Sequence, residues 1–256
     1  MTVTRSARLA LWRDKFIVEE RYLEPAARRR LYFTAGVLIV VGALAFAILL
    51  TGVLTRTGFE QLDAPVEAWF NTQVRDDVTG FMIALAIIFG PVALPLIILV
   101  VLIVWIIAAR HLWRPLLLAA GMVTGVVLAQ IIAPLVQHPR PPVGQMLFGP
   151  DHSFSFPSGH VLGTSDFLLI LAFLLASRLQ RRWFTILAFA AAIAAIVAQI
   201  VSRLYLGYHW ISDTTASIAL SLVIVGTVIA IDTHRTVRVP GEPVTGPNSQ
   251  LQRDGT

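Results

Sequence analysis

The chain has 256 residues, of which 56% are hydrophobic and only 14% are charged. These charged residues are too few to cover a soluble globule of this length, so the composition predicts an integral membrane protein. Cysteine is absent, which excludes disulfides, thiolate metal sites and cysteine nucleophiles.

Six segments are long and apolar enough to cross a bilayer. A helix needs about 20 apolar residues to span a hydrocarbon core of roughly 30 Å. The predicted spans cover residues 31–54, 81–109, 116–136, 161–176, 183–201 and 211–231. The second span is long and contains Gly90-Pro91 and Pro95, which predict that it is kinked or tilted. The sequence therefore predicts an all-α protein, an integral membrane bundle of six transmembrane helices.

Arginine accounts for nearly all of the positive charge, because Lys15 is the only lysine in a chain of net charge +5. Basic residues beside a span favour the cytoplasmic side, and here they cluster at alternate span ends. The clusters lie at residues 28–30, 110–114, 178–182 and 235–238. The pattern predicts cytoplasmic termini in a multi-pass protein of the plasma or inner membrane. Without a basic stripe that carries interleaved aromatic residues, no nucleic-acid partner is expected.

The predicted organisation has three parts. A basic cytoplasmic arm covers residues 1–30, a membrane domain covers residues 31–232, and a cytoplasmic tail covers residues 233–256. The tail is rich in proline and glycine, which predicts disorder.

Two segments outside the spans have helical patterns. The stretch "RSARLALWRDKF" near the N-terminus predicts either an amphipathic helix on the inner leaflet or a solvated basic arm. In the first outer loop, apolar residues at helical spacing predict an interfacial helix that either packs on the bundle or controls substrate access. These residues are Leu62, Val66, Trp69 and Phe70.

Three polar motifs lie at the outward ends of the last four spans. They are "QHPRPP" after the third span, "FPSGH" before the fourth, and "SRLYLGYHWISD" between the fifth and sixth. Unpartnered ionisable groups cost several kcal/mol at this depth, so their convergence predicts a functional site. The motifs contribute Arg140, Ser158, Gly159, His160, Arg203, His209 and Asp213.

The site is predicted to bind an anion with several oxygens. Ser158 suits the cap of a helix, and Gly159 lets backbone N–H groups approach a ligand. The fourth and sixth spans both direct helix N-termini at this face. Arg140 and Arg203 add planar guanidinium groups that match phosphate oxygens.

Two histidines and an aspartate supply the predicted chemistry. His209 and Asp213 are four residues apart at the start of a helix, so the carboxylate can orient one imidazole nitrogen and leave the other as a nucleophile. His160, on another helix, can protonate a leaving alkoxide and then deprotonate water. The simplest scheme is a covalent phosphohistidine that is hydrolysed.

The remaining polar residues are interpreted structurally. The histidines at positions 111, 138, 152 and 234 are expected to be solvated or capping residues. Asp166, inside the fourth span, is expected to make a buried hydrogen bond, either protonated or paired. The outward carboxylates Asp63, Glu67, Asp76, Asp77 and Asp151 are expected to be solvated loop charges, so no metal and no cofactor is predicted.

These motifs resemble those of the type 2 phosphatidic acid phosphatase (PAP2) superfamily, the membrane lipid phosphatases related to glucose-6-phosphatase and the vanadium haloperoxidases. The family pattern is Lys, six residues, Arg-Pro; then Pro-Ser-Gly-His; then Ser-Arg, five residues, His, three residues, Asp. The second and third motifs are complete here. The resemblance implies metal-independent hydrolysis with His209 as nucleophile, Asp213 as its partner and His160 as acid/base. It also implies phosphate ligands, namely Arg140, Ser158, Gly159 and Arg203.

The first motif departs from the family pattern, because its lysine position is Ala133. His138, Gln130 or Gln137 could replace the lysine as donors. The predicted substrate is a lipid phosphate, of the phosphatidic acid, phosphatidylglycerol phosphate or polyprenyl pyrophosphate type. Two alternatives stay open: a lipid phosphotransferase with the same motifs, and a non-catalytic protein that binds or transports a lipid headgroup.

Overall fold

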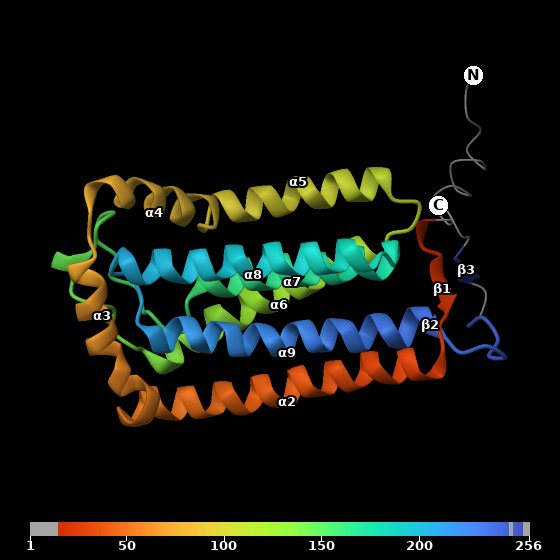
Figure 1. Ribbon diagram of the computed structural model, residues 1–256, viewed down its shortest axis with the longest axis horizontal. Helices are drawn as coiled ribbons and strands as arrows, with labels where there is room; N and C mark the ends of the chain where they lie inside the picture. Colours follow the sequence, from red (N-terminus) through yellow and green to blue (C-terminus); the bar gives the residue numbers. More distant parts are fainter. Residues whose placement is uncertain (1–14, 246–247, 253–256) are drawn as a thin grey trace, which may run out of the picture.

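The computed structural model describes residues 15–245 and 248–252. Nearly all of the segment predicted as an amphipathic helix or basic arm, "RSARLALWRDKF", lies outside these residues. The described chain forms an elongated bundle whose helices run along one axis (Figure 1).

Five helices are long and apolar enough to cross a membrane, and a bent pair of shorter helices can form a sixth crossing. The five are α2 (Pro25–Thr55), α6 (Trp113–Val136), α7 (Gly159–Leu179), α8 (Arg182–Tyr205) and α9 (Ile211–Thr236). The bent pair is α4 (Asp76–Ile88) and α5 (Ala93–Ala108), with an angle of 50° between the two helices. These helices make the chain a multi-pass membrane protein.

The kink predicted from Gly90-Pro91 is confirmed, and it is a full break between α4 and α5. A Cβ atom at Gly90 would lie 2.6 Å from the carbonyl oxygen of Ala86, so any other residue at this position would clash with the backbone. Pro91 has no N–H to continue the helix. Gly90 and Pro91 at this break line two cavities that are described below.

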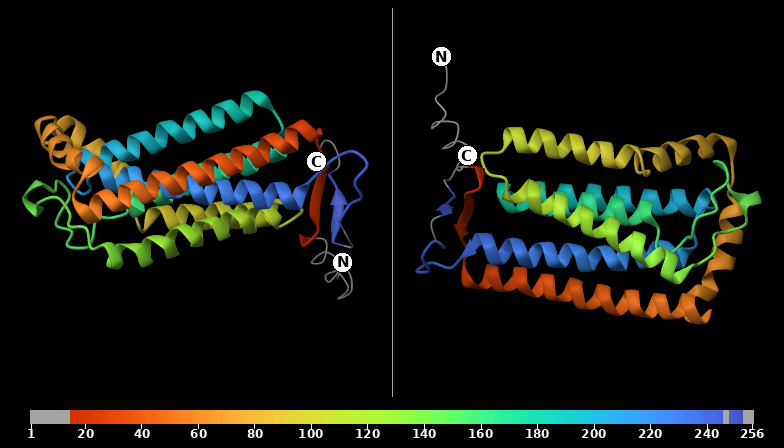
Figure 2. Two further views of the ribbon diagram at one scale, coloured as in Figure 1. Left: turned by 90° about the horizontal axis from the view of Figure 1, so that it is seen from below. Right: turned by 180° about the vertical axis from the view of Figure 1, so that it is seen from behind.

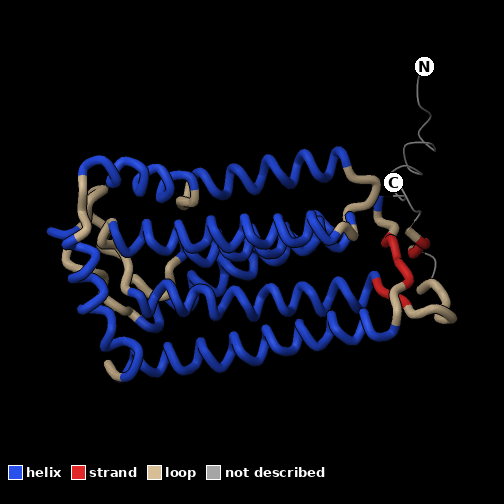
Figure 3. Tube along the Cα trace, viewed as in Figure 1, coloured by secondary structure: helices blue, strands red, loops and turns tan. Residues whose placement is uncertain are grey.

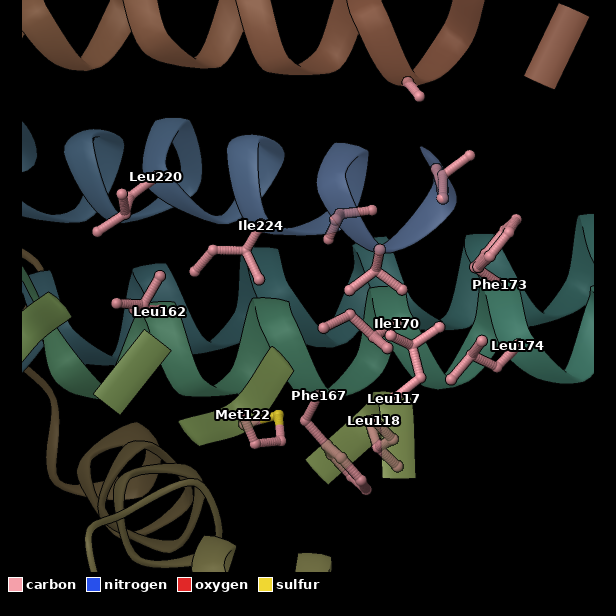
Figure 4. Close-up of a cluster of buried hydrophobic side chains, with 14 of the residues drawn as sticks. Leu117, Leu118, Met122, Leu162, Phe167, Ile170, Phe173, Leu174, Leu220 and Ile224 are labelled. Atoms are coloured by element: carbon pink, nitrogen blue, oxygen red, sulfur yellow. The ribbon is translucent and has the colours of Figure 1, made fainter. Parts of the chain in front are cut away.

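The centre of the bundle is formed by α7 and α9. Of their most apolar stretches, 56% and 61% of the residues are buried, compared with 17% in α8, 22% in α2 and 28% in α6. The outer helices therefore turn most of their apolar side chains toward the surrounding lipid. Leu118, Leu162, Ile170 and Leu174 are at most 1% exposed and pack in the central cluster drawn in Figure 4.

Close approach of backbones holds α2 against α9. A Cβ atom at Gly42 of α2 would lie 2.6 Å from the carbonyl oxygen of Ala219 in α9. In a membrane, where lipid tails are as apolar as the helix surfaces, such small-residue contacts let helices associate by van der Waals packing.

Short elements close one end of the bundle. Helix α3 (Asp63–Thr72) follows the 3-10 turn η1 (Gly58–Leu62) and crosses this end between α2 and α4 (Figure 1). The predicted helix in the first loop is thus confirmed. A second 3-10 turn, η2 (Val143–Gln145), lies in the loop between α6 and α7. Figure 3 shows that the loops before α7 and α9 also meet at this end.

A small parallel sheet lies at the other end, so the all-α prediction needs correction. It contains β1 (Val18–Tyr22), β2 (Val237–Arg238) and β3 (Ser249–Leu251), in the order β2-β1-β3. The tail predicted to be disordered therefore contributes two short strands. Strands of two or three residues have no readable periodicity, and their pairing depends on contacts far apart in the sequence.

Candidate active site

The three polar motifs meet at the bundle end that carries α3, opposite the sheet (Figure 2). The chain alternates direction from helix to helix, so α6 and α8 end here while α7 and α9 begin here. Two helix N-termini, with their unsatisfied N–H groups, therefore point at the same region as Arg140 and Arg203.

His209 and Asp213 form the predicted pair. Nδ1 of His209 lies 3.4 Å from one carboxylate oxygen of Asp213. The same oxygen accepts the backbone N–H of Trp210 at 2.9 Å, which caps α9 and holds the carboxylate toward the histidine. Asp213 is fully buried and His209 is 3% exposed, so water competes little for this contact.

The turn before His209 requires a glycine. Gly207 has φ of +74°, and a Cβ atom there would lie 2.6 Å from the carbonyl oxygen of Gln145. This conformation is open to glycine at little cost, whereas most other residues would be strained. The turn brings Tyr208 and His209 back across the end of the bundle.

Arg140 contacts Nε2, the other ring nitrogen of His209. Its Nη1 lies 3.2 Å from Nε2 of His209 and donates to the carbonyl oxygen of Tyr208 at 2.6 Å. Because a guanidinium can only donate, Nε2 is the acceptor and the proton of the neutral ring is on Nδ1, facing Asp213. Burial, helped by the nearby Arg140 and Arg203 and opposed by Asp213, lowers the pKa of His209 to about 4. The ring is therefore neutral, and the electron pair of Nε2 is directed at Arg140.

Arg203 and His160 line a cavity of about 480 Å³ beside this pair. The guanidinium of Arg203 lies 4.4 Å from the centre of the Tyr208 ring, and its Nε has no hydrogen-bond partner among the described residues. Asp151, which pairs with Arg140 at 3.0 Å, lines the same cavity. An anion placed here would meet Arg203 directly.

Ser158 and Gly159 lie at the start of α7. The Ser158 side chain is fully buried, and its hydroxyl has no partner within the described part of the chain. Its backbone joins it to α9, because the carbonyl oxygen accepts the Ser217 hydroxyl at 3.0 Å. Gly159 leaves open space where a side chain would stand, so the first N–H groups of α7 can be reached. All the predicted site residues thus lie at one end of the bundle.

His138 is buried beside Asp213, a contact that the sequence did not predict. It was expected to be a solvated or capping histidine, but it is 9% exposed and its Nδ1 lies 2.9 Å from the second carboxylate oxygen of Asp213. Burial alone would disfavour its charged form, but the hydrogen bond to Asp213 and the charges of Asp213, Asp63 and Glu60 raise the pKa of His138. Asp213 is therefore shared by two histidines. The available signal was that His138 lies only two residues before Arg140.

Two outward carboxylates also differ from expectation. Asp63 is 5% exposed, and its oxygens accept the backbone N–H of Ser212 at 2.9 Å and the Ser212 hydroxyl at 2.6 Å. Burial raises the pKa of Asp63 to about 6. Asp151 is paired with Arg140 instead of being a free loop charge. Both carboxylates are thus structural parts of the site.

One group of described residues brings metal-ligand atoms together, namely Glu60, Asp63 and His138. Their ligand atoms lie within 4.8 Å of one another. Both oxygens of Asp63 already accept hydrogen bonds from Ser212, so a metal would have to compete with the cap of α9. Within this group, His138 contacts one carboxylate oxygen of Asp213, whereas His209 lies against the other.

The family lysine has no counterpart nearby. Ala133 lies near the end of α6, three and four residues after Gln130 and Ala129, which puts it on their side of the helix. The only lysine of the chain, Lys15, lies at the other end of the bundle and donates to the carbonyl oxygen of Ile106 at 2.7 Å. Arg140 and Arg203 are therefore the permanent cations at the described site.

This arrangement defines a multi-pass membrane protein in which histidines, arginines and a buried aspartate gather at one end of the bundle. Residues 114–236 match the family model of the PAP2 superfamily. This matched region of the chain contains the second and third motifs. The resemblance inferred from those motifs is confirmed for this part of the chain.

The chain is also similar to one characterised sequence and to one solved structure. Over 118 residues the chain is 27% identical to phosphatidylglycerophosphatase B of Bacillus subtilis (strain 168), a match that covers 45% of this chain and 56% of that protein's length. The fold is similar to the crystal structure of a transmembrane PAP2 type phosphatidylglycerolphosphate phosphatase from Bacillus subtilis. That comparison has a TM-score of 0.70 at 21% identity, over 77% of this chain and 96% of the other.

Proposed function

We propose that this protein is a membrane lipid phosphatase that removes phosphate from a lipid phosphomonoester or pyrophosphate. The observation that carries the proposal is the orientation of His209, whose Nδ1 faces Asp213 while Nε2 faces Arg140 beside a cavity with a second histidine. The PAP2 match and the name of the curated relative support a phosphatase acting on a lipid phosphate.

The first chemical step is attack of Nε2 of His209 on phosphorus. The bond from phosphorus to the lipid oxygen breaks, and His160 gives its proton to that oxygen. The negative charge of a bound phosphate beside His160 favours the protonated ring that this step requires. Arg140 moves from His209 to the phosphate oxygens, with Arg203 and the start of α7 stabilising the others.

The second step releases the product. His160, now neutral, takes a proton from a water molecule that attacks the phosphohistidine. The nitrogen–phosphorus bond breaks, inorganic phosphate leaves, and His209 returns to its starting state. Asp213 stabilises the positive charge that develops on the imidazole during both transfers. No step needs a metal ion.

We further propose that the site faces the extracytoplasmic side, with both termini in the cytoplasm and residues 31–232 as the catalytic domain. The basic clusters beside the spans support this orientation, because they lie at the end of the bundle opposite the site.

A panel of lipid phosphates tests the proposal. Purified protein in detergent is expected to release inorganic phosphate from at least one of phosphatidic acid, phosphatidylglycerol phosphate and a polyprenyl pyrophosphate. Activity is expected to persist in EDTA, because the proposed nucleophile and acid/base are histidines. Loss of activity in EDTA with rescue by Mg²⁺ would point instead to a metal at Glu60, Asp63 and His138. Transfer of phosphate to an added alcohol or lipid, without free phosphate, would identify a phosphotransferase.

His138 is expected to act as a positioning residue for Asp213. His138→Phe keeps a ring against Phe156 and Trp210 but removes the hydrogen bond to the buried carboxylate, and kcat is expected to fall about tenfold. His138→Asn retains an N–H close to the position of Nδ1 and is expected to recover most of that loss. KM is expected to change less than about twofold in both, since His138 orients Asp213 and lies apart from the cavity. Equal losses in the two variants, or a change mainly in KM, would contradict this role.

A further inference from the structure

A second cavity, of about 280 Å³, adjoins the active-site cavity. It lies between α5, α6 and α7, and both cavities are lined by Gly90, Pro91 and His160. Its walls are mostly apolar and include Leu94, Ile98, Met122 and Leu162. The two cavities therefore lie next to each other, and a molecule that reached both would pass these three residues.

Asp166 of α7 lines this second cavity and has no role in the proposed chemistry. It is fully buried, and neither carboxyl oxygen has a hydrogen-bond partner of normal geometry within the described residues. Ser221 of α9 interacts with the carboxyl group, yet its hydroxyl also lacks such a partner. Asp166 follows His160 by six residues, which puts it about 9 Å further along the helix at the usual rise per residue.

The surrounding sequence makes room for this carboxyl group. A Cβ atom at Gly125 of α6 would lie 2.2 Å from Oδ2 of Asp166, so any larger residue there would displace it. An unpaired carboxylate in an apolar cavity would cost far more than the protonated acid, which favours a neutral group that can donate one hydrogen bond. The contact with Ser221 lacks normal hydrogen-bond geometry, so this donor remains available to a ligand acceptor in the cavity.

We propose that the second cavity binds the acyl ester region of a glycerolipid phosphate, with Asp166 donating a hydrogen bond to an ester carbonyl oxygen. This inference rests on the proposed function and narrows its substrate class. In a diacylglycerol phosphate the ester carbonyls follow the phosphate within a few bonds, at the depth of Asp166. A polyprenyl pyrophosphate carries no acceptor beyond its phosphates and would offer none to the buried acid, which disfavours this substrate.

The test compares phosphatidic acid with its dialkyl ether analogue of equal chain length, which lacks only the carbonyl groups. For the wild-type protein, kcat/KM for the ester lipid is expected to exceed that for the ether lipid about five- to twentyfold, the range of one buried hydrogen bond. Asp166→Leu is expected to bring this ratio close to one. Asp166→Asn keeps a neutral donor of the same size and is expected to preserve most of the preference.

Gly125→Ala provides a second route, because it displaces the carboxyl group without changing its chemistry. It is expected to reduce the ratio as Asp166→Leu does, so the inference stays testable if one variant fails to fold. An ester to ether ratio near one in the wild-type protein would overturn the inference. A loss in Asp166→Asn equal to that in Asp166→Leu would overturn it as well, and would indicate proton transfer by Asp166.

Failure of the proposed function would look different, since no lipid would then release phosphate. In that case the test would compare the binding of phosphatidic acid with that of its dialkyl ether analogue, measured by quenching of the intrinsic tryptophan fluorescence. Tighter binding of the ester lipid that depends on Asp166 would support it, and equal binding would overturn it.

Discussion

Replacement of His209 by alanine is expected to reduce phosphate release from a lipid phosphate to background, a loss of at least about 10³-fold. The side chain is buried, with a carboxylate of Asp213 at Nδ1 and the guanidinium of Arg140 at Nε2. The measurement is release of inorganic phosphate by purified protein in detergent. His152→Ala is the matched control, because His152 is an exposed histidine of the loop between α6 and α7.

The pH dependence follows from the same environment. The pKa of His209 is lowered to about 4, so the neutral, nucleophilic ring is present above that value and is lost as the pH falls through it. We therefore expect kcat/KM to show no loss from His209 protonation between about pH 7 and pH 5. Full turnover by His209→Ala protein, with its fold intact, would contradict the proposed mechanism.

Replacement of His160 by alanine is expected to lower turnover of a lipid substrate about 10²- to 10⁴-fold, the usual contribution of a positioned acid/base group. His160 lines a cavity together with Arg203, where the proposed mechanism places the leaving oxygen and the attacking water. A nitrophenolate leaving group needs no proton, so p-nitrophenyl phosphate is expected to phosphorylate His209 of the variant. The resulting phosphohistidine is expected to be hydrolysed slowly, because the general base is missing.

The measurement is a burst of nitrophenolate together with acid-labile, alkali-stable phosphate on the protein, as expected of a phosphohistidine. The double variant His160→Ala/His209→Ala is the control and should show neither. If His160→Ala loses activity equally on the lipid and on the activated ester, with no phosphoprotein, then His160 does not act as the acid/base.

Much of the membrane architecture could be predicted because its cause is local. The hydrophobic length of each span depends only on consecutive residues, so the crossings were found near their observed positions. The break at Gly90-Pro91 follows from the missing N–H of proline and the space that only glycine leaves. The motif residues were also readable, since a histidine or arginine at a span end needs a partner whatever the fold.

The contacts of His138 and Asp63 could not be predicted from the sequence. Both looked like loop residues, and only the fold brings His138 to Asp213, across 75 residues, and Asp63 to Ser212, across 149 residues. Hydropathy and helical periodicity report on neighbours within a few turns, whereas these hydrogen bonds depend on how α3, α6 and α9 pack.

The same distinction applies to Asp166 and to the sheet. The sequence by itself determined that a carboxyl group lies within the fourth span, six residues after His160. Only the tertiary structure decided that Gly125 of α6 leaves space for it and that α5, α6 and α7 enclose a cavity there. It also decided that β1 pairs with strands more than 200 residues away. The physical reason is that a span depends on the free energy of its own residues in lipid, while a cavity or a strand pair depends on which distant surfaces come into contact.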